Sequence, residues 1–324
     1  MQALLLEQQD GKTLASVQTL DASRLPEGDV TVDIHWSSLN YKDALAITGK
    51  GKIIRNFPMI PGIDFAGTVR ASEDPRFHAG QEVLLTGWGV GENHWGGLAE
   101  QARVKGDWLV AMPQGLNARK AMVIGTAGFT AMLCVMALED AGVRPQDGEI
   151  VVTGASGGVG STAVALLHKL GYQVVAVSGR QSTHEYLKSL GACRILPRDE
   201  FAESRPLEKQ LWAGAIDTVG DKVLAKVLAQ MNYGGCVAAC GLAGGFTLPT
   251  TVMPFILRNV RLQGVDSVMT SPARRAQAWQ RLVTDLPESF YAQAAKEISL
   301  AEAPKFAEAI INNQIQGRTL VKVN

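Results

Sequence analysis

A glycine-rich turn is the segment whose residue types most directly indicate chemistry. Residues 154–160 read Gly-Ala-Ser-Gly-Gly-Val-Gly, between an apolar strand-like run, Glu149–Thr153, and an apolar helical stretch, Ser161–Leu170. Backbone N–H groups of such a turn, with the positive end of the helix that follows, can hold a pyrophosphate. Ala155 stands at the first glycine position of the G-x-G-x-x-G pattern, and the other two positions are glycine. The turn predicts a dinucleotide site; a structural tight turn is the alternative.

The end of the next strand predicts which nucleotide is bound. An NAD-selective site places an acid there for the ribose 2′-hydroxyl, but this chain reads Val-Ser-Gly-Arg over residues 177–180. Ser178 can form a hydrogen bond, and Arg180 can make a bidentate contact with a 2′-phosphate, which selects NADPH. Arg198 could supply a further cation to the same phosphate. The alternative is that Arg180 is a solvated arginine at a strand end.

Short β-branched runs alternate with helical stretches from Gly148 to about Val265. Because these runs are apolar throughout, they predict a doubly wound parallel sheet that is covered on both faces. Ser182 followed by Glu185 predicts a helix that begins with a capping box. The expected strands are Glu149–Thr153, Gln173–Ser178, Ala215–Val219, Cys236–Cys240 and Val260–Val265.

The first third of the chain follows another pattern. Short strands at Val30–Ile34, Gly67–Val69 and Glu82–Leu85 are separated by Gly, Pro and Asp turns, which suggests an irregular antiparallel barrel. The tail has a helix near Ala303–Asn312 and a terminal strand, Thr319–Val323, too short to form a domain alone. We expect the tail to return to the first domain.

Length and composition limit the class of protein. The 324 residues suffice for about two domains, and 31 Lys+Arg balance 31 Asp+Glu, which argues against a nucleic-acid binder. Four cysteines without a CxxC pair make a zinc finger or a disulfide framework improbable and favour a reducing cytoplasm. The residues Met1–Lys12 do not resemble a secretory or transit signal. The uncharged run Ala121–Leu138 is interrupted by glycines and threonines, so we interpret it as a buried helix.

Four motifs carry a family resemblance over essentially the whole chain. Asn40-Tyr41-Lys42-Asp43, residues 61–67, residues 125–131 and the glycine turn occur in the order and spacing of the medium-chain dehydrogenase/reductase superfamily. They resemble its zinc-free, quinone-oxidoreductase-like branch. More narrowly, residues 38–43, 48–52, 254–258 and 264–268 resemble the NADPH-dependent acrylyl-CoA reductases.

The resemblance implies an α/β fold, with a doubly wound parallel Rossmann sheet and an irregular GroES-like β-barrel catalytic domain. It assigns residues 1–122 to the catalytic domain, 123–265 to the NADPH-binding domain and 266–324 to a segment that returns to the catalytic domain. It also implies a homodimer joined through the edge of the nucleotide sheet, near Val260–Val268.

The same resemblance bears on metal binding. Where zinc-dependent relatives place Cys, His and Cys, this chain has Asn40, Ile63 and Thr126, and such groups cannot hold Zn²⁺ tightly. Residues 86–97 lack the four cysteines of a structural zinc lobe, and His94 is expected to be a surface or packing residue. We therefore expect no metal.

Without a Lewis acid, the expected reaction is hydride addition to an alkene that a carbonyl activates. The resemblance places Asn40 and Tyr41 beside the nicotinamide, with Tyr41 as donor or acid and Asn40 as a polar orienter; a solvent proton is the alternative. Asp64 either fixes the loop geometry or moves protons, and Asp43 is expected to bond backbone at a turn. The expected NADPH contacts are Tyr41, Thr130, Ser156, Gly157, Gly158, Val159, Ser178, Gly179, Arg180, Arg198, Leu242, Ile256, Ser267 and Asn313.

The leading expectation is therefore a cytoplasmic, NADPH-dependent 2-enoyl-CoA reductase that converts acrylyl-CoA to propionyl-CoA. An NADPH:quinone oxidoreductase on the same scaffold and an NADPH-binding protein with little turnover are the alternatives. Lys50, Lys52 and Arg55 cluster in one loop, where they either meet the phosphates of a CoA substrate or only keep the loop solvated.

Overall fold

The computed structural model describes residues 1–323, which form two compact units. Unit 1 contains Met1–Thr126, Ser267–Ala276 and the described residues from Tyr291 onward, and unit 2 contains Ala127–Asp266 and Gln277–Phe290. The grouping differs from the domain ranges expected from the sequence because residues 277–290 belong to unit 2. In that unit the ring of Trp279 stacks on that of Phe129, with 5.9 Å between the centroids.

Unit 2 is built on a six-stranded, wholly parallel sheet with the strand order β10-β9-β8-β11-β12-β13. The order reverses at β8, as it does in dinucleotide-binding folds. Each of the five strands expected from the sequence overlaps an observed strand, and the edge strand β10 was not among them. The strands are β8 (Glu149–Val152), β9 (Gln173–Val177), β10 (Ala192–Leu196), β11 (Trp212–Asp217), β12 (Met231–Ala239) and β13 (Arg261–Gly264).

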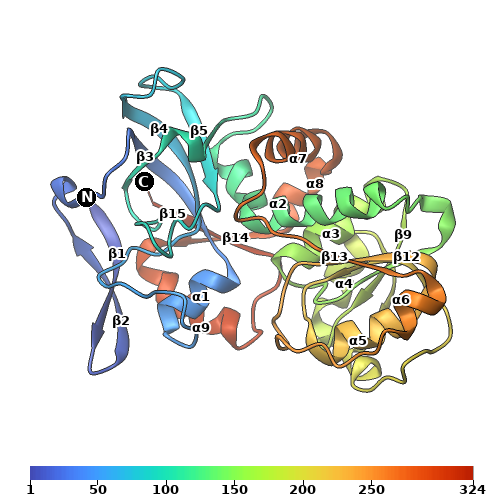
Figure 1. The fold of residues 1–324 in the computed structure, drawn as a ribbon. Helices are drawn as coiled ribbons and strands as arrows, with labels where there is room; N and C mark the ends of the chain where they lie inside the picture. Colours follow the sequence, from blue (N-terminus) through green and yellow to red (C-terminus); the bar gives the residue numbers. More distant parts are fainter. Residues whose placement is uncertain (324) are drawn as a thin grey trace. The chain divides into compact units, whose positions relative to one another are not determined.

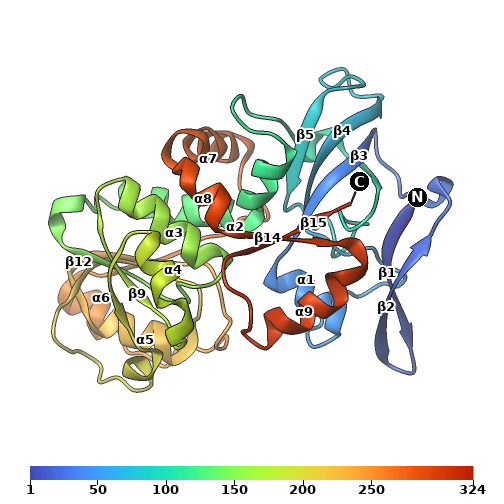
Figure 2. The ribbon, with the colours of Figure 1, turned by 180° about the vertical axis from the view of Figure 1, so that it is seen from behind.

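Helices cover both faces of this sheet, which explains why its central strands are apolar throughout. The helices α5 (Asp221–Ala229) and α6 (Met253–Arg258) lie in front of the sheet in Figure 1. The helices α3 (Gly158–Lys169) and α4 (His184–Ser189) come to the front in the reverse view of Figure 2. The expected capping box at Ser182 is wrong: this residue lies in a 3-10 turn before α4, and Glu185 bonds Lys188 instead.

Unit 1 contains a seven-stranded mixed sheet with the order β14-β15-β3-β4-β5-β7, in which β6 also pairs with β3. The tail supplies β15, which runs antiparallel to β3, and β14, which runs parallel to β15. A separate hairpin is formed by β1 (Gln2–Gln9) and β2 (Lys12–Thr19). The sheet strands are β3 (Val30–Leu39), β4 (Asp64–Ser72), β5 (Glu82–Thr86), β6 (Gln101–Val104), β7 (Leu109–Ala111), β14 (Ala295–Ser299) and β15 (Arg318–Lys322).

Two helices of unit 1 pack side by side, as both ribbon views show: α1 (Tyr41–Thr48) and α9 (Ala303–Ile311). Two further helices are α7 (Pro272–Asp285) and α8 (Glu288–Gln293). The 3-10 segments are Ala22–Arg24, Gly106–Trp108, Pro145–Asp147, Gln181–Thr183, Arg198–Phe201 and Leu300–Glu302.

The helix α2 (Ala118–Asp140) contains the uncharged run noted in the sequence. Among the described residues it alone has the length and apolar composition of a membrane span, but nearly all of its most apolar stretch is buried. The burial identifies it as a core helix. Its geometry breaks at Gly125, where φ is +51° and ψ is −161°.

Candidate active site and cofactor site

The glycine turn of unit 2 has the backbone geometry of a nucleotide-binding turn. Gly154 has φ +57°, and α3 begins at Gly158, with Gly157 as its N-cap. A Cβ atom on Gly160 would lie 2.3 Å from the carbonyl oxygen of Gly154, so only glycine fits there. The close approach brings the first N–H groups of a three-turn helix to the end of β8, where they can meet an anion.

Two cations and two hydroxyls gather at the end of β9. Arg180 Nη2 donates to Ser156 Oγ at 3.0 Å, and the Arg180 backbone N–H donates to Ser178 Oγ at 3.3 Å. A Cβ built on Gly179 would lie 3.7 Å from Arg198 Nε, so the second guanidinium borders the same turn. Partial burial lowers the pKa of Arg180. These groups fit the phosphate of an adenosine 2′-phosphate.

The other expected cofactor residues are more dispersed. Val159 lies in the first turn of α3, Thr130 is 5% exposed on α2, and Leu242 follows β12. Ile256 is 72% exposed on α6, which covers the opposite face of the sheet from α3. Ser267 and Asn313 belong to unit 1, and Asn313 has φ +54°.

A fully buried carboxylate, Asp64, is the centre of a hydrogen-bond network in unit 1. Its Oδ1 accepts from Ser38 Oγ at 2.7 Å and from the Ser38 N–H at 3.2 Å. Its Oδ2 accepts from Asn40 Nδ2 at 3.0 Å and from the Thr126 N–H at 2.7 Å. The carboxylate therefore joins the end of β3, the start of α1 and the kink in α2.

Arg318, at the start of β15, completes this network and is only 2% exposed. Its guanidinium donates to Ser38 Oγ at 2.8 Å, to Asn40 Oδ1 at 3.2 Å and to the Val123 carbonyl at 2.9 Å. Sequence reasoning missed this residue. The sequence does contain one signal for it: Arg318 is a charged residue at the edge of an otherwise apolar strand. A cation buried there needs hydrogen-bonding partners, so its position indicates a polar network.

The network distinguishes Asn40 from Tyr41. Both N–H bonds of the Asn40 amide are used, one toward Asp64 and one toward Asp43, and the side chain is 8% exposed. Tyr41 is the first residue of α1, is 41% exposed and has no hydrogen-bond partner for its hydroxyl among residues 1–323. The side chain that remains available to a ligand is therefore Tyr41.

Asp43 lies under the same turn, 1% exposed. Its carboxylate accepts backbone N–H groups from Asn40, Gly62 and Ile63 at 2.9 to 3.1 Å, which confirms the expected backbone role. Burial, followed by the charge of Asp64, raises the pKa of Asp43 to about 7. The turn that presents Tyr41 is thus anchored by two neighbouring acids.

The donor set in this region does not fit zinc. Within residues 1–323 no three His, Cys, Asp or Glu side chains are grouped as a metal site. At the positions where a zinc enzyme needs ligands, Asn40 is engaged by acids and an arginine, and Ile63 has no donor atom. His94 packs edge-on against Trp108 and bonds the Arg103 carbonyl at 2.7 Å, which confirms its packing role.

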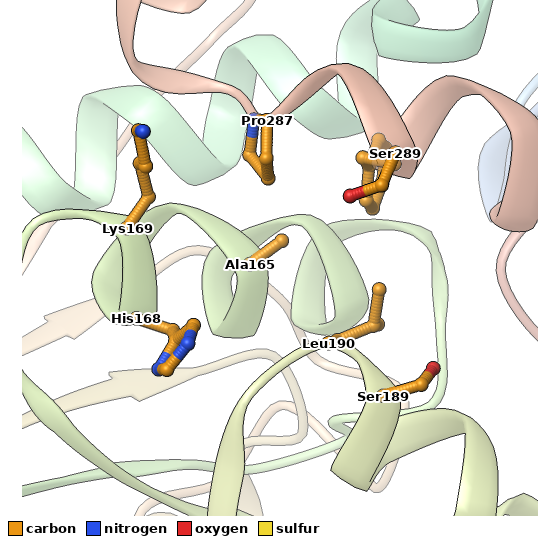
Figure 3. Close-up of a pocket in the computed structure, with 8 residues that line it drawn as sticks. Ala165, His168, Lys169, Ser189, Leu190, Pro287 and Ser289 are labelled. Atoms are coloured by element: carbon orange, nitrogen blue, oxygen red, sulfur yellow. The ribbon is translucent and has the colours of Figure 1, made fainter.

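Unit 2 also has a cavity of about 440 Å³ outside these sites. It lies at the C-terminal end of α3, the end opposite the glycine turn, and Figure 3 shows Ala165 and Leu190 facing it, with Ser289 across from them. None of the expected site residues lines it, so it belongs to neither site.

Comparison with known proteins agrees with these two units. Residues 26–114 match the family model described as alcohol dehydrogenase GroES-like domain, and residues 158–284 match the one described as zinc-binding dehydrogenase. This pairing of domains defines the medium-chain dehydrogenase/reductase architecture.

Individual relatives narrow the family. An Escherichia coli protein called "Probable acrylyl-CoA reductase AcuI" is 95% identical over 100% of both chains. The acrylyl-CoA reductase AcuI of Ruegeria pomeroyi is 52% identical over 98% of this chain and 97% of its own length. A pig quinone oxidoreductase is 27% identical over 75% of this chain and 74% of its own. The crystal structure of Escherichia coli K-12 YhdH with bound NADPH has 95% identity, a TM-score of 0.99 and full coverage of both chains.

The chain belongs to the medium-chain dehydrogenase/reductase superfamily and, within it, to the family of the acrylyl-CoA reductases.

Replacing Arg318 with methionine should destabilise unit 1, because it removes the cation from a buried network that contains two carboxylates. We expect a loss of about 3–5 kcal/mol in the free energy of unfolding, measured with denaturant. Arg258→Met is the matched control, since Arg258 bonds backbone carbonyls in unit 2 and no buried acid. Equal losses of unfolding free energy in the two variants would contradict a special contribution of this network to stability.

The raised pKa of Asp43 predicts a pH-dependent stability. Between pH 3.8, the ordinary pKa of an aspartate, and about pH 7, the folded protein holds a proton on Asp43 that the unfolded chain has released. The free energy of unfolding should therefore fall by up to about 1.4 kcal/mol per pH unit through this range and level off above pH 7. Denaturation series from pH 5 to pH 8 measure the slope. Asp43→Asn should lose this component, and an unchanged slope in the variant would assign it to other groups.

Proposed function

We propose that this protein is an NADPH-dependent 2-enoyl-CoA reductase that converts acrylyl-CoA to propionyl-CoA. The observation that carries the proposal is 95% identity over the full length of a relative that bears an acrylyl-CoA reductase name. The alcohol dehydrogenase fold alone would not suffice, because one fold hosts many substrates.

Unit 2 binds the cofactor in this proposal. When bound, NADPH supplies the hydride that adds to the β-carbon of the thioester's double bond. The α3 N-terminus holds the pyrophosphate, and Arg180, Arg198 and Ser178 hold the 2′-phosphate. The hydrogen bond between Arg180 and Ser156 supports this role, because it holds the Arg180 guanidinium in place beside the glycine turn before NADPH binds. No acid lies at this strand end to favour NAD.

Unit 1 supplies the polar group for the substrate. As the β-carbon gains the hydride pair, negative charge moves to the thioester oxygen, and a proton must then reach the α-carbon. We assign Tyr41 as the hydrogen-bond donor to that oxygen or as the acid, because the residue is 41% exposed and its hydroxyl has no partner among the described residues. Asn40 and Asp64 act as positioning residues, since their polar groups bond one another.

Quinone reduction is the second candidate, supported by the 27% identity to a pig quinone oxidoreductase. One experiment separates the two: NADPH absorbance is followed with acrylyl-CoA, crotonyl-CoA or a simple quinone as acceptor. Faster turnover per active site with the enoyl thioesters supports the reductase. Turnover with the quinone alone would favour the second candidate. If no acceptor supports turnover, the result would favour an NADPH-binding protein with little activity.

We further propose a cytoplasmic homodimer. Four cysteines without a disulfide support a reducing compartment. For the dimer, the edge strand β13 is largely exposed, and α6, which contacts the neighbouring strand β12, exposes Ile256 and Leu257 at 72% and 56%. Light scattering after size exclusion checks the mass, and a monomer would remove this proposal.

Arg180→Ala should reduce the preference for NADPH. The Michaelis constant for NADPH should rise roughly 10- to 100-fold, the effect of losing charge-assisted hydrogen bonds, whereas that for NADH should change little. Arg194→Ala is the control, because Arg194 pairs with Glu149 elsewhere in unit 2. Equal use of NADPH and NADH by the unmodified enzyme would contradict the assignment of Arg180 to the 2′-phosphate.

Tyr41→Phe should lower the turnover number by roughly 100-fold or more, in the range of general acid catalysis, with a smaller effect on NADPH binding. Steady-state kinetics and a fluorescence titration with NADPH measure the two effects. Tyr233→Phe, at a 72% exposed tyrosine of unit 2, should change neither. An unchanged turnover number in Tyr41→Phe would remove Tyr41 from the chemistry.

A further inference from the structure

The loop between α1 and Met59 carries three cations that differ in their partners. Lys50 Nζ forms an ion pair with Glu308 Oε2 of α9 at 2.7 Å. Lys52 and Arg55 are exposed, and neither has an ion-pair or hydrogen-bond partner among residues 1–323. Two of the three charges are therefore available to an anion from outside the chain.

The backbone of this loop is fixed, although its charges are exposed. Ile53, Ile54 and Phe57 pack against the core cluster that also contains α1 side chains. A Cβ atom on Gly51 would lie 3.0 Å from the Cβ of Leu45, so the loop runs directly against α1. Lys52 and Arg55 are three positions apart on this loop, and a fixed backbone reduces the entropy lost when they bind a ligand.

The position of the loop relates it to Tyr41. The first residue of α1 is Tyr41, and the loop leaves its last turn at Gly49, which has φ +68°. Eight helical residues span about 12 Å at ~1.5 Å per residue. The exposed tyrosine and the unpaired cations thus lie at opposite ends of one short helix. An acyl-CoA has the same layout, with its acyl group and its phosphates separated by the pantetheine arm.

We propose that Lys52 and Arg55 form a subsite for the phosphate groups of the CoA portion of the substrate. This inference rests on the proposed function. Arg55 offers a planar fork for one phosphate and Lys52 a point charge. Lys50 is not included, because Glu308 already neutralises it.

Exposed cations on a loop usually contribute only solvation, and an isolated surface ion pair contributes little. Several exposed arginines of unit 1 do have acidic partners, as Arg70 has with Asp33 and Arg119 with Glu297. Lys52 and Arg55 differ from these in lying three positions apart on one loop, in having no ion-pair partner within residues 1–323, and in being held on a packed backbone. Those three properties together favour a ligand with several negative charges.

The test compares two substrates that share the acrylyl-pantetheine arm: acrylyl-CoA, which also carries the 3′-phosphoadenosine diphosphate, and acrylyl-pantetheine, which lacks it. In the Lys52→Ala/Arg55→Ala variant, the KM for acrylyl-CoA should rise about tenfold or more, while kcat changes less than about twofold. Kinetics with acrylyl-pantetheine should match those of the unmodified enzyme. The control variant, Lys105→Ala/Lys322→Ala, removes the same charge from exposed positions elsewhere in unit 1 and should leave both substrates unaffected.

An unchanged KM for acrylyl-CoA in the Lys52/Arg55 variant overturns the subsite and leaves the proposed function intact. If the unmodified enzyme does not reduce acrylyl-CoA, the proposed function fails first. Calorimetric titration with CoA itself then decides the subsite: weaker binding by the variant supports it, and equal affinity overturns it. Dephospho-CoA, which lacks the 3′-phosphate, shows in either case which phosphate is bound.

Discussion

The buried carboxylate of Asp64 is the contact on which the arrangement of unit 1 depends. Four donors from three elements meet on its two oxygens, and they tie Ser38, Asn40 and the backbone of Thr126 together. A charge out of contact with water needs such complete solvation by the protein. The helix α1 has only eight residues, too few to be stable on helix propensity alone. The hydrogen bonds to the buried carboxylate therefore fix the geometry of the turn that carries Tyr41.

In this arrangement the neighbouring residues Asn40 and Tyr41 have different roles. The Asn40 amide is hydrogen-bonded to Asp43, Asp64 and Arg318, whereas Tyr41 is 41% exposed. A donor held by a rigid support needs little reorganisation when charge develops on a substrate oxygen. In unit 2 the N–H groups at the start of α3 are brought to the end of β8 by the close backbone approach at Gly160.

Patterns that are local in the sequence predicted local structure well. The parallel sheet follows from apolar runs, the nucleotide turn from adjacent glycines, and the backbone role of Asp43 from its place beside a turn. The role of Arg318 was not predicted, because its partners lie about 200 to 280 positions away and no local sequence pattern encodes such a contact. The capping box predicted at Ser182 was wrong for a local reason: Glu185 accepts a hydrogen bond from Lys188, three positions later, and not from the backbone at the helix start.

The chain order of the two units has a consequence for biosynthesis. Arg318 bonds Asn40 across 278 positions, and all of unit 2 lies between them in the chain. At roughly 5–20 residues per second, a ribosome needs roughly 15 to 55 seconds to make that interval. During this time the nascent first segment must carry its paired acids without their cation, while the contiguous nucleotide sheet already has every strand it needs. Unit 2 can therefore fold first, and unit 1 is completed last.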